Sequence, residues 1–235
     1  GELLAASDLS TRPDHMYTNA GADGALVEFG TSAFTAAAYN FDVLFSGDPQ
    51  GALLSLWRVN SVAELNKSIA WGIGYDTEDI DDDGYVAENR EWILADILHS
   101  KPQVISYGAL GSYTRSSPDL RILVGTNAGF LHMFGNDDGE EDWAFFPKEL
   151  APVLTTRRKN LSSGSRPYGI ASEVVLYTVD QDKDGTLDAD DGDTAWLYTG
   201  LRRGGRAMYA LDISDADVPA FMWMIDFSMS GFEEL

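Results

Sequence analysis

The chain has 235 residues and a formal net charge of −22, from 38 acidic and 16 basic side chains. With 44% hydrophobic residues it can bury a core, which argues against a disordered acidic tail, and the negative charge argues against nucleic-acid binding. No run approaches the roughly 18 apolar residues of a membrane span, and the absence of cysteine excludes disulfides and thiolate metal sites.

A glycine turn followed by aromatic and branched residues recurs along the chain. Such a unit predicts a tight turn that leads into a β-strand. In chain order, the four copies run over residues 23–29, 47–57, 125–134 and 204–212, and the first of them is the weakest. A regular propeller blade takes about 40–45 residues, whereas these copies are unevenly spaced. The repeat is therefore interrupted by insertions.

The third and fourth copies have the clearest surroundings. Strands are predicted at 121–125, 130–134 and 143–146 around the third copy, and at 207–213 and 221–225 around the fourth. Strands joined by tight turns in this order form an antiparallel meander, the unit of a propeller blade. We therefore expect one all-β domain over 1–235, an irregular β-propeller or a propeller fragment of a larger chain, with four-stranded meander blades and short helical insertions. A β-sandwich is the alternative.

Helix is expected only in short insertions. Residues 62–70 form one candidate and 147–154 another, in which Pro147 favours the start and Pro152 limits the length. The alternation within the strands predicts a set of core side chains. They are Ile122, Val124, Leu131, Met133, Trp143, Phe145, Met208, Tyr209, Leu211 and Trp223.

The strongest chemical signal is the acidic stretch that begins at Asp180. Counted from there, positions 1, 3, 5, 9 and 12 carry the carboxylates of Asp180, Asp182, Asp184, Asp188 and Asp191, and position 6 is glycine. This is the oxygen-ligand spacing of a calcium loop, in which position 7, here Thr186, supplies its main-chain carbonyl.

We therefore predict a Ca²⁺ site formed by these six residues. Two features depart from the usual loop. Asp191 stands where glutamate is normal, and strand patterns at 173–179 and 194–199 place the loop in a hairpin instead of between two helices. The alternative is a solvated acidic turn without a bound ion.

A second acidic stretch has weaker spacing. Asp79, Asp81 and Asp83 again stand at positions 1, 3 and 5 before a glycine, but position 12 is Arg90, a cation where a ligand is needed. Glu88 is a substitute if the loop takes another path. A second calcium site and a solvated run of charges are both open at this point.

Catalytic chemistry finds little support. The histidines at 15, 99 and 132 lack metal-ligand spacing, and His132 lies within a predicted strand, which favours a structural role. A relay of Asp96, His99 and Ser100 has no nucleophile-elbow context. We expect no catalytic residues and no enzyme activity.

Four stretches, in this order, resemble the C-terminal propeller domain of the PilY/PilC family of type IV pilus tip-associated proteins. They run over 90–102, over 122–134 together with 143–147, over 180–188, and over 200–213. In that family a nine-residue loop of alternating aspartates binds calcium, and it matches Asp180, Asp182, Asp184, Thr186 and Asp188 here. The resemblance covers residues 85–235, and the first third of the chain is compatible but diverged.

The resemblance implies a calcium-binding adhesin domain on the cell surface, at the pilus tip or associated with the outer membrane, that regulates attachment and pilus extension versus retraction. Its implied partners are pilin or minor pilins and a host or surface receptor. A quinoprotein dehydrogenase is the alternative, because its propeller blades carry a similar glycine–aromatic pattern, although the lack of cysteine counts against it. A structural surface domain of a high-salt organism is a third interpretation.

Overall fold

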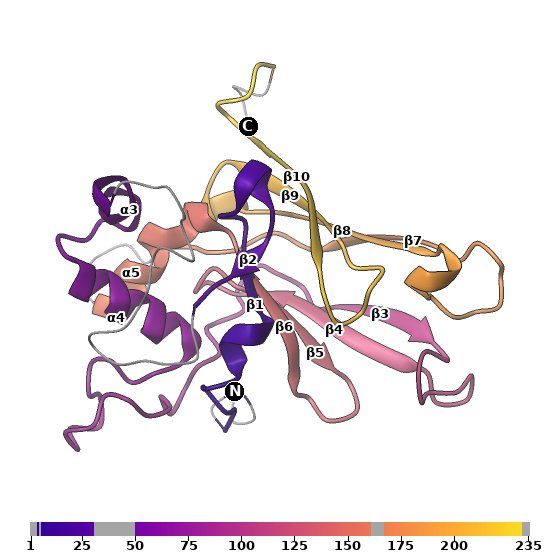
Figure 1. Ribbon diagram of the computed structural model, residues 1–235, viewed down its shortest axis with the longest axis horizontal. Coiled ribbons are helices and arrows are strands. Elements are labelled where there is room, and N and C mark those ends of the chain that lie inside the picture. Colours follow the sequence, from indigo (N-terminus) through magenta and orange to yellow (C-terminus); the bar gives the residue numbers. More distant parts are fainter. Residues whose placement is uncertain (1–3, 5, 31–49, 161–166, 232–235) are drawn as a thin grey trace.

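The chain folds into two β-sheets that fan out from a group of helices (Figure 1). The computed structural model describes residues 4, 6–30, 50–160 and 167–231. Within these ranges three α-helices and several short 3₁₀ turns accompany the sheets, so the described fold is mostly β, as the sequence predicts. The described residues do not by themselves close a propeller ring.

The first sheet has the strand order β2-β1-β6-β5-β4-β3. Its strands are Met16–Thr18 (β1), Val27–Glu28 (β2), Gln103–Gly108 (β3), Asp119–Gly125 (β4), Leu131–Gly135 (β5) and Glu141–Phe146 (β6). Strands β3 to β6 form a four-stranded antiparallel meander, which includes the three strands predicted at 121–146. Strand β1 extends this meander in parallel to β6, with Tyr17 opposite Phe145.

The second sheet is a four-stranded antiparallel meander with the order β10-β9-β8-β7. Its strands are Val175–Val179 (β7), Thr194–Gly200 (β8), Ala207–Asp212 (β9) and Ala220–Asp226 (β10). The acidic stretch after Val179 connects β7 to β8, which confirms that it lies in a hairpin.

The helices gather beside one end of the two sheets (Figure 1). They are Gln50–Trp57 (α3), Val62–Ile73 (α4) and Ala151–Lys159 (α5), and the 3₁₀ turns are Arg12–His15, Ala22–Gly24, Lys148–Leu150, Ala189–Asp191 and Arg202–Gly204. Helix α4 confirms the helix predicted at 62–70. It begins where the Ser61 hydroxyl, at the N-cap, accepts a hydrogen bond from the Glu64 N–H at 3.2 Å.

The strand predicted within 47–57 is wrong, because α3 occupies residues 50–57; residues 47–49 lie outside the described part. The segment has no β-branched residue and is rich in leucine and alanine, which favour helix. Its Trp57 is buried, with ring centroids 6.3 Å from Phe29 and 6.1 Å from Phe146. The weak copy at 23–29 yields only the two residues of β2.

The expectation that Pro152 limits the helix at 147–154 is also wrong. Helix α5 begins at Ala151, so Pro152 lies in its first turn, where a missing N–H leaves no hydrogen bond unmade. The helix continues to Lys159 and ends at Asn160, which has a left-handed φ of 40°.

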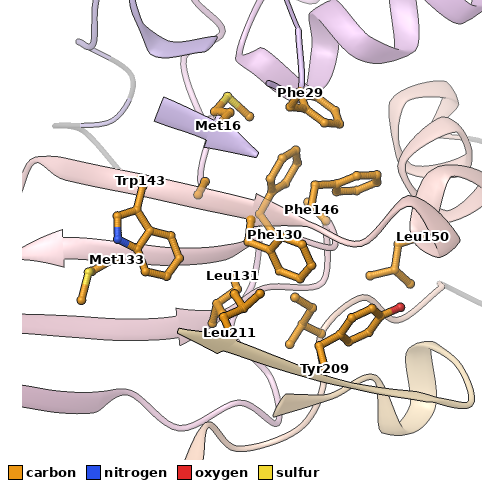
Figure 2. Close-up of a cluster of buried hydrophobic side chains, with 14 of the residues drawn as sticks. Met16, Phe29, Phe130, Leu131, Met133, Trp143, Phe146, Leu150, Tyr209 and Leu211 are labelled. Carbon is orange, nitrogen blue, oxygen red and sulfur yellow. The ribbon is translucent and has the colours of Figure 1, made fainter. Parts of the chain in front are cut away.

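The core lies between the two meanders and continues under the helices. Figure 2 shows Phe130, Leu131 and Trp143 of the first sheet region facing Tyr209 and Leu211 of the second. The rings of Phe145 and Tyr209 meet edge to face across the gap, with centroids 5.7 Å apart. This face-to-face contact of two sheets is the arrangement from which both sandwiches and propellers are built.

Most of the predicted core is confirmed. Val124, Leu131, Met133, Trp143, Phe145, Tyr209 and Leu211 are buried. Ile122 and Trp223 are only partly buried, and Met208 is 41% exposed. Met208 alternates with Tyr209, so it projects from the outer face of the second sheet, which no described residue covers well enough to bury it.

Candidate metal centre

The acidic loop from Asp180 follows directly from the end of β7 and makes a tight turn on itself. Lys183 has a φ of 62° and Gly185 a φ of 86°, so two left-handed residues reverse the chain within a few positions. Glycine at the second of these positions avoids the steric cost that a side chain adds there. The turn brings the alternating aspartates to one side.

Main-chain N–H groups hold the carboxylates of this loop in place. Asp180 accepts from the N–H groups of Lys183 at 2.6 Å and Gly185 at 2.9 Å. Asp184 accepts from the N–H of Thr186 at 2.7 Å, and Asp182 from that of Asp184 at 3.1 Å. The carboxylates are therefore oriented by the loop backbone itself.

The structure brings together three of the six predicted calcium ligands. Asp180, Asp182 and Asp184 each offer a carboxylate oxygen, and these oxygens lie within 4.8 Å of one another. Asp188 is not in this group; its carboxylate accepts from the N–H of Asp190 at 2.9 Å. Asp191 is also outside the group, exposed at the end of the 3₁₀ turn Ala189–Asp191.

Opposing effects shift the pKa values of Asp180 and Asp182 in different directions. Burial raises the pKa of Asp180, but the N–H donors of Gly185 and Lys183 outweigh it and the net shift is downward. For Asp182, the N–H of Asp184 lowers the pKa, yet burial and the negative charges of Asp184 and Asp180 shift it upward overall. Oxygen donors held this close favour a hard divalent cation.

Asp193 is a structural residue of the loop that the spacing argument missed. It is buried, and its two carboxylate oxygens accept from the N–H of Gln181 at 2.7 Å and from that of Asp188 at 3.0 Å. It therefore ties the beginning of the loop to its later half. The only sequence feature that points to Asp193 is its position immediately before β8, because the calcium-loop pattern ends two residues earlier.

The loop also rests on the first sheet. The Leu187 N–H donates to the Tyr107 carbonyl of β3 at 3.0 Å, and the Arg115 guanidinium donates to the main-chain oxygen of Asp184. A Cβ placed on Gly108 would lie 2.2 Å from the Gly185 oxygen. The candidate centre is thus packed against both meanders.

The second acidic stretch has a similar local geometry. Asp79, Asp81 and Asp83 offer oxygens within 4.8 Å of one another, and Asp79 accepts from the N–H groups of Asp83 at 3.0 Å and Gly84 at 3.1 Å. Exposed aspartates of an Asx turn adopt this arrangement without an ion. A second calcium site and a solvated run of charges therefore both stay open as interpretations of this stretch.

Two residues that follow this turn, Glu88 and Arg90, occupy the positions where later ligands would be needed. Arg90 is buried, and its guanidinium lies over the Trp71 ring at 3.7 Å, which accounts for an arginine at the twelfth position. Burial and the charges of Asp83 and Asp81 raise the pKa of Glu88, so its carboxylate lies in the field of the turn.

His132, Asp96 and Ser100 make contacts within the fold. His132 is buried and its Nδ1 lies beside a Glu141 carboxylate oxygen, which supports a structural role. Asp96 binds Arg157 and Asn127, while the Ser100 hydroxyl accepts from the Gly125 N–H at 2.9 Å.

Sequence comparison relates part of the chain to type IV pilus proteins. It is 28% identical over 165 residues to the type IV pilus biogenesis factor PilY1 of Pseudomonas aeruginosa strain UCBPP-PA14, and 31% identical over 157 residues to PilY1 of strain PAO1. A PilY1 homolog of Xylella fastidiosa is 27% identical over 154 residues. No family model matches the chain.

The matched region is a small part of these relatives. It covers 57–62% of this chain but only 12–13% of their length. A crystal structure of the P. aeruginosa PilY1 C-terminal domain matches 47% of this chain and 20% of that one, at 24% identity and a TM-score of 0.31. Among the described residues, no helix is long and apolar enough to cross a membrane. The chain is thus similar in sequence to a short region of PilY1 proteins.

Proposed function

We propose that this chain is a calcium-binding region of a type IV pilus biogenesis factor or adhesin, located at the cell surface on the pilus or outer membrane. The convergence of three aspartate oxygens within 4.8 Å, in a chain of which 62% is similar to PilY1, carries the proposal. On this proposal its partners are pilin or minor pilins and a host or surface receptor. The calcium state of the loop would influence attachment and the balance of extension and retraction.

Three of the described side chains fit the first three ligand positions of a calcium loop. Asp180, Asp182 and Asp184 provide hard oxygen donors on a backbone already turned as in a calcium loop. Asp188 and the Thr186 carbonyl follow at the spacing of the later ligands, and Asp191 is near enough in sequence for a direct or water-mediated contact. We propose an affinity of about 10⁻⁶ to 10⁻⁴ M, between sensor and extracellular loops.

Isothermal titration calorimetry with CaCl₂ tests the ion. One site with the proposed affinity supports the proposal, and no heat above that of an Asp180→Ala, Asp184→Ala double variant contradicts it. The pilus role needs a separate experiment in the source organism. The same double variant is expected to reduce attachment or piliation while the protein remains at its normal level.

We further propose that the protein acts by binding and not by catalysis. Its acidic loop lies in an exposed hairpin, and Asp96 and Ser100 are engaged in structural contacts. Dehydrogenase turnover with added quinone and calcium is the assay for the alternative. Sustained turnover that depends on the purified chain would overturn the binding proposal.

The two meanders are proposed to be neighbouring blades of an irregular propeller. The outer face of the second sheet carries the aromatic pairs Tyr177–Trp196, 5.5 Å apart, and Tyr198–Trp223, 5.9 Å apart. Tyr177 is 50% exposed, and apolar faces of this kind are normally covered. An electron cryomicroscopy structure of the intact cellular protein supports this arrangement if another meander stacks there, and contradicts it if solvent does.

A further inference from the structure

A cluster of charged side chains joins the β9–β10 turn to the first sheet. Arg121 of β4 bonds to Asp119 at 3.1 Å on the same strand and to Asp217 of the turn at 2.9 Å. Its Nη1 also donates to the Ala216 carbonyl at 3.2 Å and lies 3.4 Å from Asp142 Oδ2 on β6. One guanidinium therefore faces three carboxylates from two sheets.

Two buried hydrogen bonds dock the same turn. The Trp143 indole N–H donates to the Ala216 carbonyl at 3.2 Å, and the Tyr107 hydroxyl donates to the Ile213 carbonyl at 2.7 Å. Because both donors are completely buried, these bonds exist only while the turn is seated on the first sheet. The Trp143 N–H is thus a direct reporter of the contact between the sheets.

Asp142 is the least satisfied acid of the cluster. Its Oδ2 is buried and has no hydrogen-bond partner among the residues that the structure describes. The titratable groups around it come from every neighbouring element. They are Arg121 and Asp119 of β4, Asp138 of the β5–β6 turn, Asp217 of the β9–β10 turn, and Tyr107 of β3, which also senses Asp215.

We propose that the contact between the β9–β10 turn and the first sheet is a pH-sensitive junction, which tightens when the Asp142 carboxylate takes up a proton from solvent. Ionised, this carboxylate adds a third negative charge around a single arginine. Protonated, it removes that charge and leaves Arg121 to Asp119 and Asp217. No other bond changes in the step.

The electrostatics support this direction. Burial raises the pKa of Asp142 to about 6, the charges of Asp138, Asp119 and Asp217 add to the rise, and Arg121 opposes it. Undocking the turn removes Asp217 and exposes Asp142 to water, which lowers its pKa, although Asp138 and Asp119 stay beside it on the first sheet. Protonation of Asp142 therefore favours docking, and this contribution is lost as the pH rises through about 6.

Hydrogen exchange of the Trp143 indole N–H, followed by NMR, tests the junction. After correction for the intrinsic exchange rate, protection of the Trp143 N–H should rise about tenfold from pH 7.5 to pH 5. The reason is that pH 5 lies one unit below the Asp142 pKa of about 6, and one unit is a tenfold change in proton affinity. Asp142→Asn, which mimics the neutral form, should show high protection at both values. Asp137→Asn, an exposed acid of the adjacent turn, is the charge-matched control and should behave as wild type.

Two results would overturn the proposal: equal protection at both pH values in the wild type, or pH dependence that persists in Asp142→Asn. If Asp142→Asn does not fold, Asp217→Asn gives the second test, because the Asp217 side chain is 80% exposed. Loss of its charge should move the midpoint of the Trp143 transition to lower pH. An unchanged midpoint contradicts the junction.

Discussion

The main-chain N–H of Leu187 donates to the carbonyl of Tyr107 at 3.0 Å, so the acidic loop of one sheet is hydrogen-bonded to an edge strand of the other. Leu187 is itself buried and lies between Thr186 and Asp188, two of the predicted calcium ligands. Order in the loop and the packing of the two sheets are therefore linked. An ion that fixes the loop would also strengthen this contact.

Calcium should stabilise the folded chain. An ion that binds only the folded state adds roughly 2.7 kcal/mol to the free energy of unfolding at about 100 times its dissociation constant. Thermal unfolding with and without CaCl₂ measures this gain, and MgCl₂ should give a smaller one because magnesium needs a tighter octahedral shell. An identical melting temperature with calcium and with a chelator contradicts the prediction.

The contribution of Asp188 to calcium binding can be tested by itself. Asp188→Ala removes one predicted oxygen ligand and one charge, so calcium affinity should fall, whereas Asp79→Ala in the second acidic stretch should change it much less. Calorimetric titration of both variants gives the comparison. Wild-type affinity in Asp188→Ala would reject the predicted ligand set.

Gly108→Ala should displace the acidic loop. Gly108 has a φ of 72°, and its new Cβ would lie 2.2 Å from the Gly185 oxygen, so backbone must move. The left-handed conformation alone costs a side chain about 1–2 kcal/mol, and the clash adds to this. Chemical denaturation measures the total.

Gly111→Ala is the matched control. Gly111 has a φ of 59° but nothing within 4 Å of an added Cβ, so it isolates the conformational cost. Gly108→Ala should therefore lose more stability than Gly111→Ala and should weaken calcium binding as well. Equal effects of the two substitutions would show that the contact with Gly185 is unimportant.

Asp193→Ala should loosen the loop although Asp193 is not a predicted ligand. The substitution leaves the N–H groups of Gln181 and Asp188 without their acceptor, and a typical hydrogen bond contributes about 0.5–1.5 kcal/mol to stability. Asp190→Ala removes an equal charge from an exposed position of the same loop and should have little effect. Amide hydrogen exchange across 180–193 distinguishes the two.

The buried ion pair of Glu141 with Arg12 should make the free energy of unfolding depend on pH in the acidic range. Burial raises the pKa of Glu141, but Arg12 at 2.7 Å and His132 outweigh it and lower the pKa to about 2 from an ordinary 4.5. The resulting stabilisation is present above pH 4.5 and is lost as the pH falls toward 2. It amounts to about 3 kcal/mol, at 1.36 kcal/mol for each pKa unit.

Glu141→Gln should therefore lower the free energy of unfolding at pH 7 and flatten its dependence between pH 4.5 and 2. Glu140→Gln, its exposed neighbour in sequence, should leave both unchanged. Urea denaturation at several pH values provides the measurement. A slope in Glu141→Gln as steep as in wild type would exclude Glu141 as its source.

Local pattern determined the strands and the acidic hairpin. Alternating apolar residues and glycine turns predicted most strands of both meanders, because strand alternation and left-handed turns are properties of a few adjacent residues. The clustering of Asp180, Asp182 and Asp184 followed from spacing in the same way. These features need no information from distant parts of the chain.

Tertiary structure decided what local pattern leaves open. The burial of Trp57 on Phe29 and Phe146, for example, depends on where helix α3 packs. Met208 is exposed because burial of a strand face depends on whether another element covers it. The contacts of Asp193 with Gln181 and of Asp217 with Arg121 likewise arise only when the chain is folded, because their geometry depends on how the loop closes and how the sheets pack.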